Sequence, residues 1–249
     1  MKKLLILLAA PLFIFMTPPG KELKIKGEVK LLKPVDWIYL NYRTTTGQVK
    51  DSAKIENGEF KFETKIDEPV LASLWIYTER IEGQRPKTEN VPLFLEPGKM
   101  EISIKDSLKA ISVKGSKAHV DYLAYRSMMK PFNDQDMNLN NQYREFAKNK
   151  DEEGKKKIEE QWEVLGKQME EKNLEYLKAN MNSPIALYLL KQYAGFDIDP
   201  KKVDPLYAAL PAETKEWPSS KDFAMQVELA RKTSVGMYAM EFTQNDTLG

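Results

Sequence analysis

Between residues 23 and 113, apolar and polar residues alternate, and this period of two predicts β-strands with one buried face. The segment ELKIKGEVKL alternates along its whole length, and VLASLWIYTER is rich in strand-forming residues. In DWIYLNYR, one face carries Trp37, Tyr39 and Asn41, and the other carries Ile38, Leu40 and Tyr42. We expect about seven or eight short strands in this part of the chain.

Turn residues separate these strands. Asn57-Gly58 favours the positive backbone angles of a tight hairpin turn. Phe60, Phe62 and Ile66 follow the turn and are expected to point to one side. Pro97-Gly98 predicts a corner between two further short strands. Short strands joined by such turns predict an antiparallel β-sandwich or an open barrel.

After Gly115 the apolar spacing changes to three and four residues, which is typical of amphipathic helices. We expect a first helix with Ser116 as its N-cap, Val120, Leu123 and Ala124 on its apolar stripe, and Pro131 at its end. A polar segment, NDQDMNLNN, separates it from a longer helix. The apolar positions of that longer helix are Ile158, Trp162, Leu165, Met169, Tyr176 and Leu177.

Three further helices are expected between residues 183 and 233. The first opens at Ser183-Pro184, with Pro184 in its tolerated first turn, and stops at Gly195. The segments DPKKVDPLYAALP and SSKDFAMQVELARKT predict two more short helices, the first of them capped by Asp199. The predicted fold class is therefore α+β, with a β-sandwich or open barrel at residues 23–114 followed by a helical domain at 115–233.

The N-terminus has a different pattern. Lys2 and Lys3 precede the apolar run LLILLAAPLFIFM, which is typical of a secretory signal. The run is too short to span a bilayer, which takes about 20 residues. We expect residues 1–20 to be a signal peptide or a short N-terminal anchor and the protein to be exported. The alternative is that this run forms a strand or helix of the core.

Composition narrows the function classes. The chain has 38 Lys and Arg against 37 Asp and Glu, so its formal net charge is +1. This balance provides no field that would attract a polyanion, so we expect no nucleic-acid partner. The sequence contains no cysteine and therefore supplies no thiol for a disulfide, a redox pair, a nucleophile, a lipid anchor or a soft metal site.

Other candidate chemistry is sparse. His119 is the one histidine of the sequence, and its isolation favours a structural role. Asp197, Asp199 and Asp204 are close in sequence, but the segment lacks the central glycine and final glutamate of a calcium loop. We predict no catalytic, cofactor-binding or metal-binding residues.

Two patterns remain as alternatives. Ser127 and Lys130 have the serine-x-x-lysine spacing of penicillin-binding proteins, and residues 232–234 are similar to the lysine-threonine-glycine strand of those enzymes, so a serine hydrolase is a remote alternative. The strand aromatics are Trp37, Tyr39, Trp75 and Tyr77. They are expected in the core, because alternate positions of a sandwich strand face inward. The alternative is that they line a ligand groove.

The closing stretch, SVGMYAMEFTQNDTLG, resembles the entry to a thioredoxin-like domain of the TlpA and AhpC/TSA type. The matching positions are Gly236, Ala239, Phe242, Thr243, Asp246 and Gly249. Met240 stands in place of the usual proline and Glu241 in place of the usual aspartate. By this resemblance, residues 234–249 are the truncated first segment of such a domain.

The first half resembles the domain of unknown function that precedes the thioredoxin-like domain in exported thiol-disulfide oxidoreductases of Gram-negative bacteria. The pattern is carried by Asp51-Ser52-Ala53, Asn57-Gly58 with Phe60 and Phe62, Pro69, Phe94, Glu96-Pro97-Gly98 and Lys114-Gly115-Ser116. The resemblance implies a location in the periplasm or cell envelope. It also implies that the chain lacks the Cys-x-x-Cys segment that carries out disulfide exchange.

Two hypotheses follow. In the first, the chain is the non-catalytic N-terminal region of an exported thiol-disulfide oxidoreductase, which binds a protein partner, self-associates or positions the redox domain. In the second, it is a free-standing exported binding module. Under either hypothesis the chain as it stands is not an enzyme and needs no cofactor.

Overall fold

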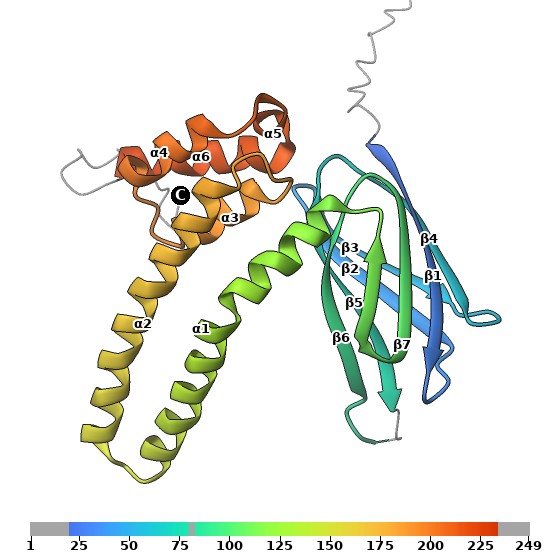
Figure 1. Ribbon diagram of the computed structural model, residues 1–249, viewed down its shortest axis with the longest axis horizontal. Helices are drawn as coiled ribbons and strands as arrows, with labels where there is room; N and C mark the ends of the chain where they lie inside the picture. The colour runs from blue at the N-terminus through green and yellow to red at the C-terminus, as the bar shows by residue number, and fades with distance from the viewer. Residues whose placement is uncertain (1–19, 80–82, 234–249) are drawn as a thin grey trace, which may run out of the picture.

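The computed structural model describes residues 20–79 and 83–233 and contains seven strands followed by six helices (Figure 1). The strands are β1 (Lys21–Leu31), β2 (Trp37–Thr44), β3 (Gly47–Lys54), β4 (Glu59–Ile66), β5 (Val70–Glu79), β6 (Lys87–Leu95) and β7 (Gly98–Lys114). The helices are α1 (Lys117–Lys148), α2 (Glu152–Ala179), α3 (Ala186–Ala194), α4 (Pro200–Ala209), α5 (Ala212–Glu216) and α6 (Pro218–Thr233). This order confirms the predicted α+β class.

The strands form two sheets, with the orders β4-β1-β7 and β3-β2-β5-β6. All pairs are antiparallel except one: β1 and β7 are parallel, with Leu23 opposite Gly98 and Leu31 opposite Asp106. The prediction of a wholly antiparallel sandwich is therefore wrong at this pair. The chain passes from one sheet to the other at the Pro97-Gly98 corner, so β7 does not pair with β6 as a hairpin would and can lie parallel to β1. At 17 residues it is also longer than the short strand expected.

One apolar core lies between the two sheets. Its largest fully buried side chains include Phe60, Leu40, Leu74 and Ile104, which come from both sheets. Phe60 and Phe62 point into this core together with Ile66, as the alternation after the hairpin turn predicts. Tyr42 and Thr64 connect the sheets by a hydroxyl–hydroxyl hydrogen bond of 2.9 Å. The N-terminal region is therefore a β-sandwich.

The predicted hairpin turn is confirmed. Asn57 and Gly58 have φ values of 53° and 79°, and Glu56 pairs with Glu59 across the turn. Asparagine and glycine are the residues that adopt this left-handed region at least cost, and two such residues in succession match the right-handed twist of the flanking strands. The strands that this turn joins do not continue as a paired hairpin, because β3 belongs to one sheet and β4 to the other, and Phe60 is placed by the pairing of β4 with β1.

Helix α1 begins with the predicted Ser116 cap but continues past Pro131 to Lys148, so the predicted end is wrong. The predicted stripe is also wrong, because Val120 is 59% exposed and Leu123 is 49% exposed. The buried face of α1 carries Ala118, His119, Tyr122, Met129 and Leu139. The polar segment expected between two helices is thus the middle of α1.

Helices α1 and α2 form a long antiparallel hairpin (Figure 1). Its own small core contains Leu139, Ile158 and Leu165 with the half-buried ring of Trp162. The Trp162 indole donates to the Asp136 carboxylate at 2.9 Å. This core holds α1 after Pro131, and the packing of Ala118 and Tyr122 against the shorter helices holds it before the proline, so the helix continues through that residue.

The shorter helices α3 to α6 pack together at the other end of the hairpin. Their core includes Leu189 and Phe223 and also takes in Phe94 of β6 and Leu71 of β5. Helix α3 starts at Ala186, so Pro184 lies just before it and not within it as predicted, whereas Gly195 and Asp199 cap helices as expected. The short helix α5 was not predicted.

The change from strands to helices occurs between Lys114, where β7 ends, and Lys117, where α1 begins. The domain boundary near residue 114 stays a prediction. Most of the predicted signal segment (1–20) and the thioredoxin-like segment (234–249) lie outside the described residues.

Candidate functional site

A cleft of about 200 Å³, here called the junction cleft, lies between the sandwich and the helices. The sandwich contributes Arg43 from β2, Leu71 from β5 and Phe94 from β6. The helical region contributes Lys191 from α3 and Trp217, which precedes α6. Small-molecule sites favour boundaries of this kind, where apolar walls meet a few polar groups.

The strand register explains how the sandwich side is built. In β2 the core-facing residues are Ile38, Leu40 and Tyr42, so Arg43 points to the outer face of its sheet. The pairing of Tyr42 with Ala72 places Arg43 next to Leu71, which also points outward. The helices pack on the outer face of the sheet near Leu71, and the cleft lies between them and that face.

Glu68 lies in the loop between β4 and β5 and reaches across the cleft to the helices. Its carboxylate accepts two hydrogen bonds from Ser219, one from the hydroxyl at 2.9 Å and one from the backbone N–H at 3.3 Å. Ser219 is in the first turn of α6, where backbone N–H groups lack helical partners and favour a negative charge. Burial nevertheless raises the pKa of the Glu68 carboxyl, and the bonds from Ser219 offset only part of that shift.

Lys191 lies on the helical side of the cleft. Its ammonium donates to the Ser219 carbonyl at 2.9 Å and lies 5.8 Å from the centre of the Phe223 ring. Burial lowers the pKa of Lys191, and the charges of Glu68 and Asp222 oppose that shift. No carboxylate of residues 20–79 or 83–233 lies within ion-pair distance of this ammonium.

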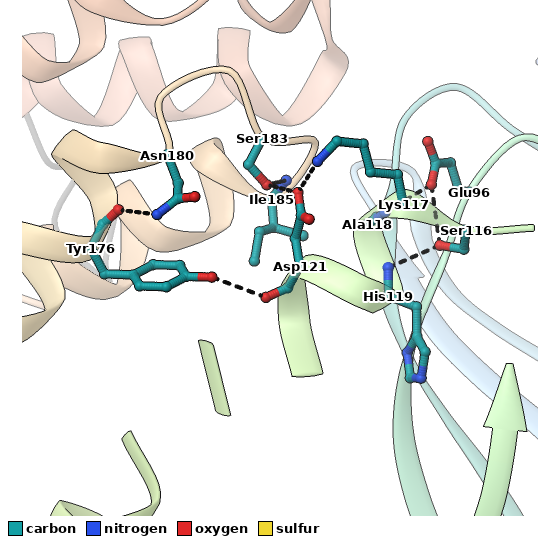
Figure 2. A network of polar contacts seen from close by, with 10 residues as sticks. All are labelled: Glu96, Ser116, Lys117, Ala118, His119, Asp121, Tyr176, Asn180, Ser183 and Ile185. Carbon is teal, nitrogen blue, oxygen red and sulfur yellow. Dashed lines mark hydrogen bonds and ion pairs between the residues drawn. The ribbon is translucent and has the colours of Figure 1, made fainter. Parts of the chain in front are cut away.

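A second polar cluster joins the sandwich to the start of α1 (Figure 2). The Glu96 carboxylate accepts from the Ser116 hydroxyl at 3.1 Å and from the Ala118 N–H at 2.9 Å. The Ser116 oxygen accepts in turn from the His119 N–H at 2.9 Å. Together, Glu96 and Ser116 satisfy the first N–H groups of α1 and fix the direction in which the helix leaves the sandwich.

His119 completes this joint. Its imidazole is 2% exposed, and Nδ1 accepts from the Phe94 N–H at 3.3 Å. Burial lowers the pKa of the imidazole, and the nearby Arg126 lowers it further. His119 therefore packs at the sandwich–helix joint as a neutral acceptor.

The other end of the joint connects α1 to the loop before α3. The Asp121 carboxylate accepts from the Ser183 hydroxyl and from the Lys117 ammonium, each at 2.5 Å (Figure 2). Tyr176 of α2 donates from its hydroxyl to the Asp121 carbonyl at 3.4 Å. Asp121 thus connects α1 to α2 and to the loop before α3.

Residues 23–122 match the family model of a domain of unknown function, DUF4369. No curated protein and no solved structure matches the chain. The matched segment begins within β1, includes the other six strands and ends at Tyr122, shortly after the Ser116 cap. Its end has a structural reason: the first turns of α1 pack on Phe94 and belong to the same joint as Glu96.

The strand aromatics lie on the outer face of the β3-β2-β5-β6 sheet, so their expected place in the core is wrong. Trp37 is 45% exposed, and the rings of Tyr39, Trp75 and Tyr77 are half-buried. The alternation in β2 places Trp37 and Ile38 on opposite faces of the sheet, but the alternation alone does not determine which face is buried. The aliphatic side chains occupy the interior here.

These rings pack on one another. Tyr39 and Trp75, which are opposite in register, stack with ring centres 4.2 Å apart, and Tyr77 contacts both edge to face. In the amide orientation that satisfies both of its polar atoms, Asn41 accepts from the Trp75 indole at 2.9 Å. Trp37, Tyr39 and Tyr77 line a cleft of about 220 Å³ together with Asp36.

The remaining sequence candidates are separate from both clefts. Ser127 is exposed in the middle of α1, and Lys130 donates to Asp134 at 2.5 Å. Asp199 caps α4 through a hydrogen bond from the Lys201 N–H. Among the described residues, no group of three or more possible ligands is placed to hold a metal ion.

Within the same described residues, none of the helices has the length and apolar character needed to cross a membrane. Sequence reasoning missed Glu68 and Lys191, because their roles depend on contacts between distant segments. Three lining residues had been singled out from the sequence for other reasons, Pro69 and Phe94 in the family pattern and Pro184 at a helix start.

Proposed function

We infer that this chain is the non-catalytic N-terminal region of an exported thiol-disulfide oxidoreductase. Its role is to bind a partner, to self-associate or to position a redox domain. The observation that carries this proposal is the DUF4369 match at residues 23–122. The same segment contains the ordered motifs that resemble the region preceding thioredoxin-like domains.

The placement of those motifs supports a positioning role. Phe94, Glu96 and Ser116 meet at the joint that sets the direction of α1. A helix whose first turn is held by a carboxylate, a hydroxyl and a buried contact to a strand leaves the sandwich at a defined angle. The α1–α2 hairpin therefore leaves the sandwich in a defined direction, which suits it to hold another domain or a partner at a fixed distance.

The direct test is to read the codons that follow Gly249 in the gene. An in-frame Cys-x-x-Cys segment would support the proposal, and a stop codon directly after Gly249 would contradict it. If the reading frame continues, removal of residues 23–233 is expected to preserve thiol exchange with a small disulfide but to slow reduction of the native client protein.

Export is a component of the same proposal, supported by Lys2, Lys3 and the apolar run that follows them. Fractionation of cells that produce the complete chain is expected to find it in the periplasm or cell envelope. A chain that lacks residues 1–20 is the control and is expected to remain in the cytoplasm.

A second candidate function is a free-standing binding module. The observation that favours it is the outer-face position of Trp37 and its neighbours, since exposed aromatic groups of this kind often mark binding surfaces. Trp37→Ala is expected to abolish ligand binding by such a module without loss of the fold. A stop codon after Gly249 would favour this function over the first.

A further inference from the structure

We propose that the junction cleft binds a carboxylate with an apolar body, with Arg43 and Lys191 holding the carboxylate and Phe94 and Trp217 contacting the apolar portion. The proposal concerns the cleft alone and is independent of whether a redox domain follows this chain.

The charges of the lining favour an anion. Arg43, Glu68 and Lys191 are the charged groups among the residues that line the cleft. The carboxylate of Glu68 is engaged by Ser219, and its pKa is raised. Two cations thus face one carboxylate that is already hydrogen-bonded, and an incoming carboxylate meets a site of complementary charge.

Neither cation makes an ion pair within residues 20–79 and 83–233, although the charges of Glu68 and Asp222 act on Lys191 from a greater distance. Arg43 is exposed at the rim and makes no ion pair there. Lys191 has a carbonyl and an aromatic ring as its neighbours. An ammonium held in this way remains able to accept a further anionic partner, and a guanidinium can bind a carboxylate through two parallel hydrogen bonds.

The walls of the cleft favour an apolar body on the ligand. Phe94 is buried, Leu187 is buried and Trp217 is half-buried, and all three line the cleft. The volume of about 200 Å³ is smaller than the roughly 300–1,000 Å³ of sites for drug-sized ligands. The cleft therefore suits one ring or a short apolar chain and is too small for a nucleotide.

This chemistry has two possible sources: a free aryl or alkyl carboxylic acid, and the C-terminal carboxylate of a peptide that ends in an apolar residue. The probes are 3-phenylpropionate and N-acetyl-Leu-Phe, each compared with its own amide, which has the same shape without the charge. Binding is measured by calorimetry and by the fluorescence of Trp217, with a Trp217→Phe variant to identify the signal.

We expect each acid that binds to do so at least tenfold more tightly than its amide. Arg43→Gln is expected to weaken binding of the acid at least tenfold, and Lys191→Met is expected to do the same. Arg144→Gln, the same change on the α1–α2 hairpin, is the matched control and is expected to leave the affinity unchanged. Tighter binding of the peptide acid would identify a protein C-terminus as the source, and binding of the free acid alone would identify a small molecule.

Equal affinities for acid and amide would overturn the proposal, as would unchanged affinity in Arg43→Gln or no binding of either acid at millimolar concentration. Lys191 also bonds to Ser219, so its replacement can affect folding. Arg43 is exposed and makes no such bond, so the Arg43→Gln result decides the question if Lys191→Met does not fold.

Discussion

The Glu68 carboxylate accepts hydrogen bonds from both the backbone N–H and the hydroxyl of Ser219, a residue 151 positions later in the chain. Glu68 belongs to a loop of the sandwich, and Ser219 belongs to the first turn of α6. Trp217 and Pro218 precede Ser219 and have no side-chain oxygen to cap the helix. The sandwich therefore supplies the cap that the helix lacks, and the same contact closes one side of the junction cleft.

Replacement of Glu68 tests this cap. Glu68→Ala removes both acceptor contacts and is expected to lower the free energy of unfolding by about 1 kcal/mol, a typical loss for a helix cap. Glu68→Gln retains an acceptor oxygen for Ser219 and is expected to lose less. Urea unfolding of the three proteins measures both effects, and equal stability of Glu68→Ala and wild type would contradict the assigned role.

The pH dependence of the same variants gives a second test. Burial raises the folded-state pKa of Glu68 above the ordinary value of 4.5, so the folded state holds this proton more tightly than the unfolded chain does. The stability contributed by Glu68 is thus greatest below pH 4.5 and declines as the pH rises through the folded pKa. Relative to Glu68→Gln, which does not ionise, wild type is expected to lose stability over that interval. Parallel stability curves would show that the pKa is not raised.

The stability that His119 contributes is expected to change with pH in the opposite direction. Burial lowers its folded pKa below the ordinary value of 6.5, so the unfolded chain takes up the proton first on acidification. Its contribution to stability is present above pH 6.5 and is lost as the pH falls through the folded pKa.

Since His119 is the one histidine of the sequence, its proton resonances can be followed by NMR without overlap from another imidazole. A titration midpoint below 6.5 is expected, and a midpoint at or above that value would contradict burial as the dominant influence. His119→Asn, which keeps an acceptor near the Phe94 N–H, is expected to remove the loss of stability just below pH 6.5.

Signals that act over a few residues were predictable from the sequence. Asn57-Gly58 sets its own turn, and Ser116 and Asp199 bond to N–H groups two or three positions later. In each case the chemistry is complete within one short segment. Tertiary context has little opportunity to change the result.

Features that depend on distant contacts were not predictable in this way. The rule that proline ends a helix failed at Pro131, because two separate cores hold α1, one that contains Tyr122 before the proline and one that contains Leu139 after it. The buried face of α1 also depends on distant contacts. Residues of β6 and α3 pack on the face that carries Tyr122, so Tyr122 is buried and Val120 is exposed. The sequence did not predict the junction cleft, because its polar groups converge only when the helices pack on the sandwich.

A close approach in the sandwich provides a stability prediction. Gly27 of β1 lies opposite Phe60 of β4, and a Cβ at position 27 would overlap the Phe60 ring. Gly27→Ala is expected to lower the free energy of unfolding by about 1–3 kcal/mol, the usual cost of adding an atom to a filled core.

Gly166 of α2 supplies the matched control. It is exposed, and no atom lies within 4 Å of the position that a Cβ would take. Gly166→Ala is expected to stabilise the protein by about 1 kcal/mol, because alanine is the better helix former. Thermal or urea unfolding distinguishes the two signs, and stabilisation by both substitutions would show that Phe60 moves aside without cost.

Pro131 allows a direct test of the continuous helix α1. A proline in a helix interior lacks the N–H that would donate to the fourth preceding carbonyl, here that of Ser127, and its ring crowds that turn. Pro131→Ala restores the donor and is expected to raise the free energy of unfolding by up to about 3 kcal/mol. Pro200→Ala, at the first position of α4 where no such bond is lost, is expected to change stability by less than about 0.5 kcal/mol. If Pro131→Ala destabilised the protein relative to Pro200→Ala, the proline would be required for the path of α1, and the packing around Leu139 would depend on the local geometry that it imposes.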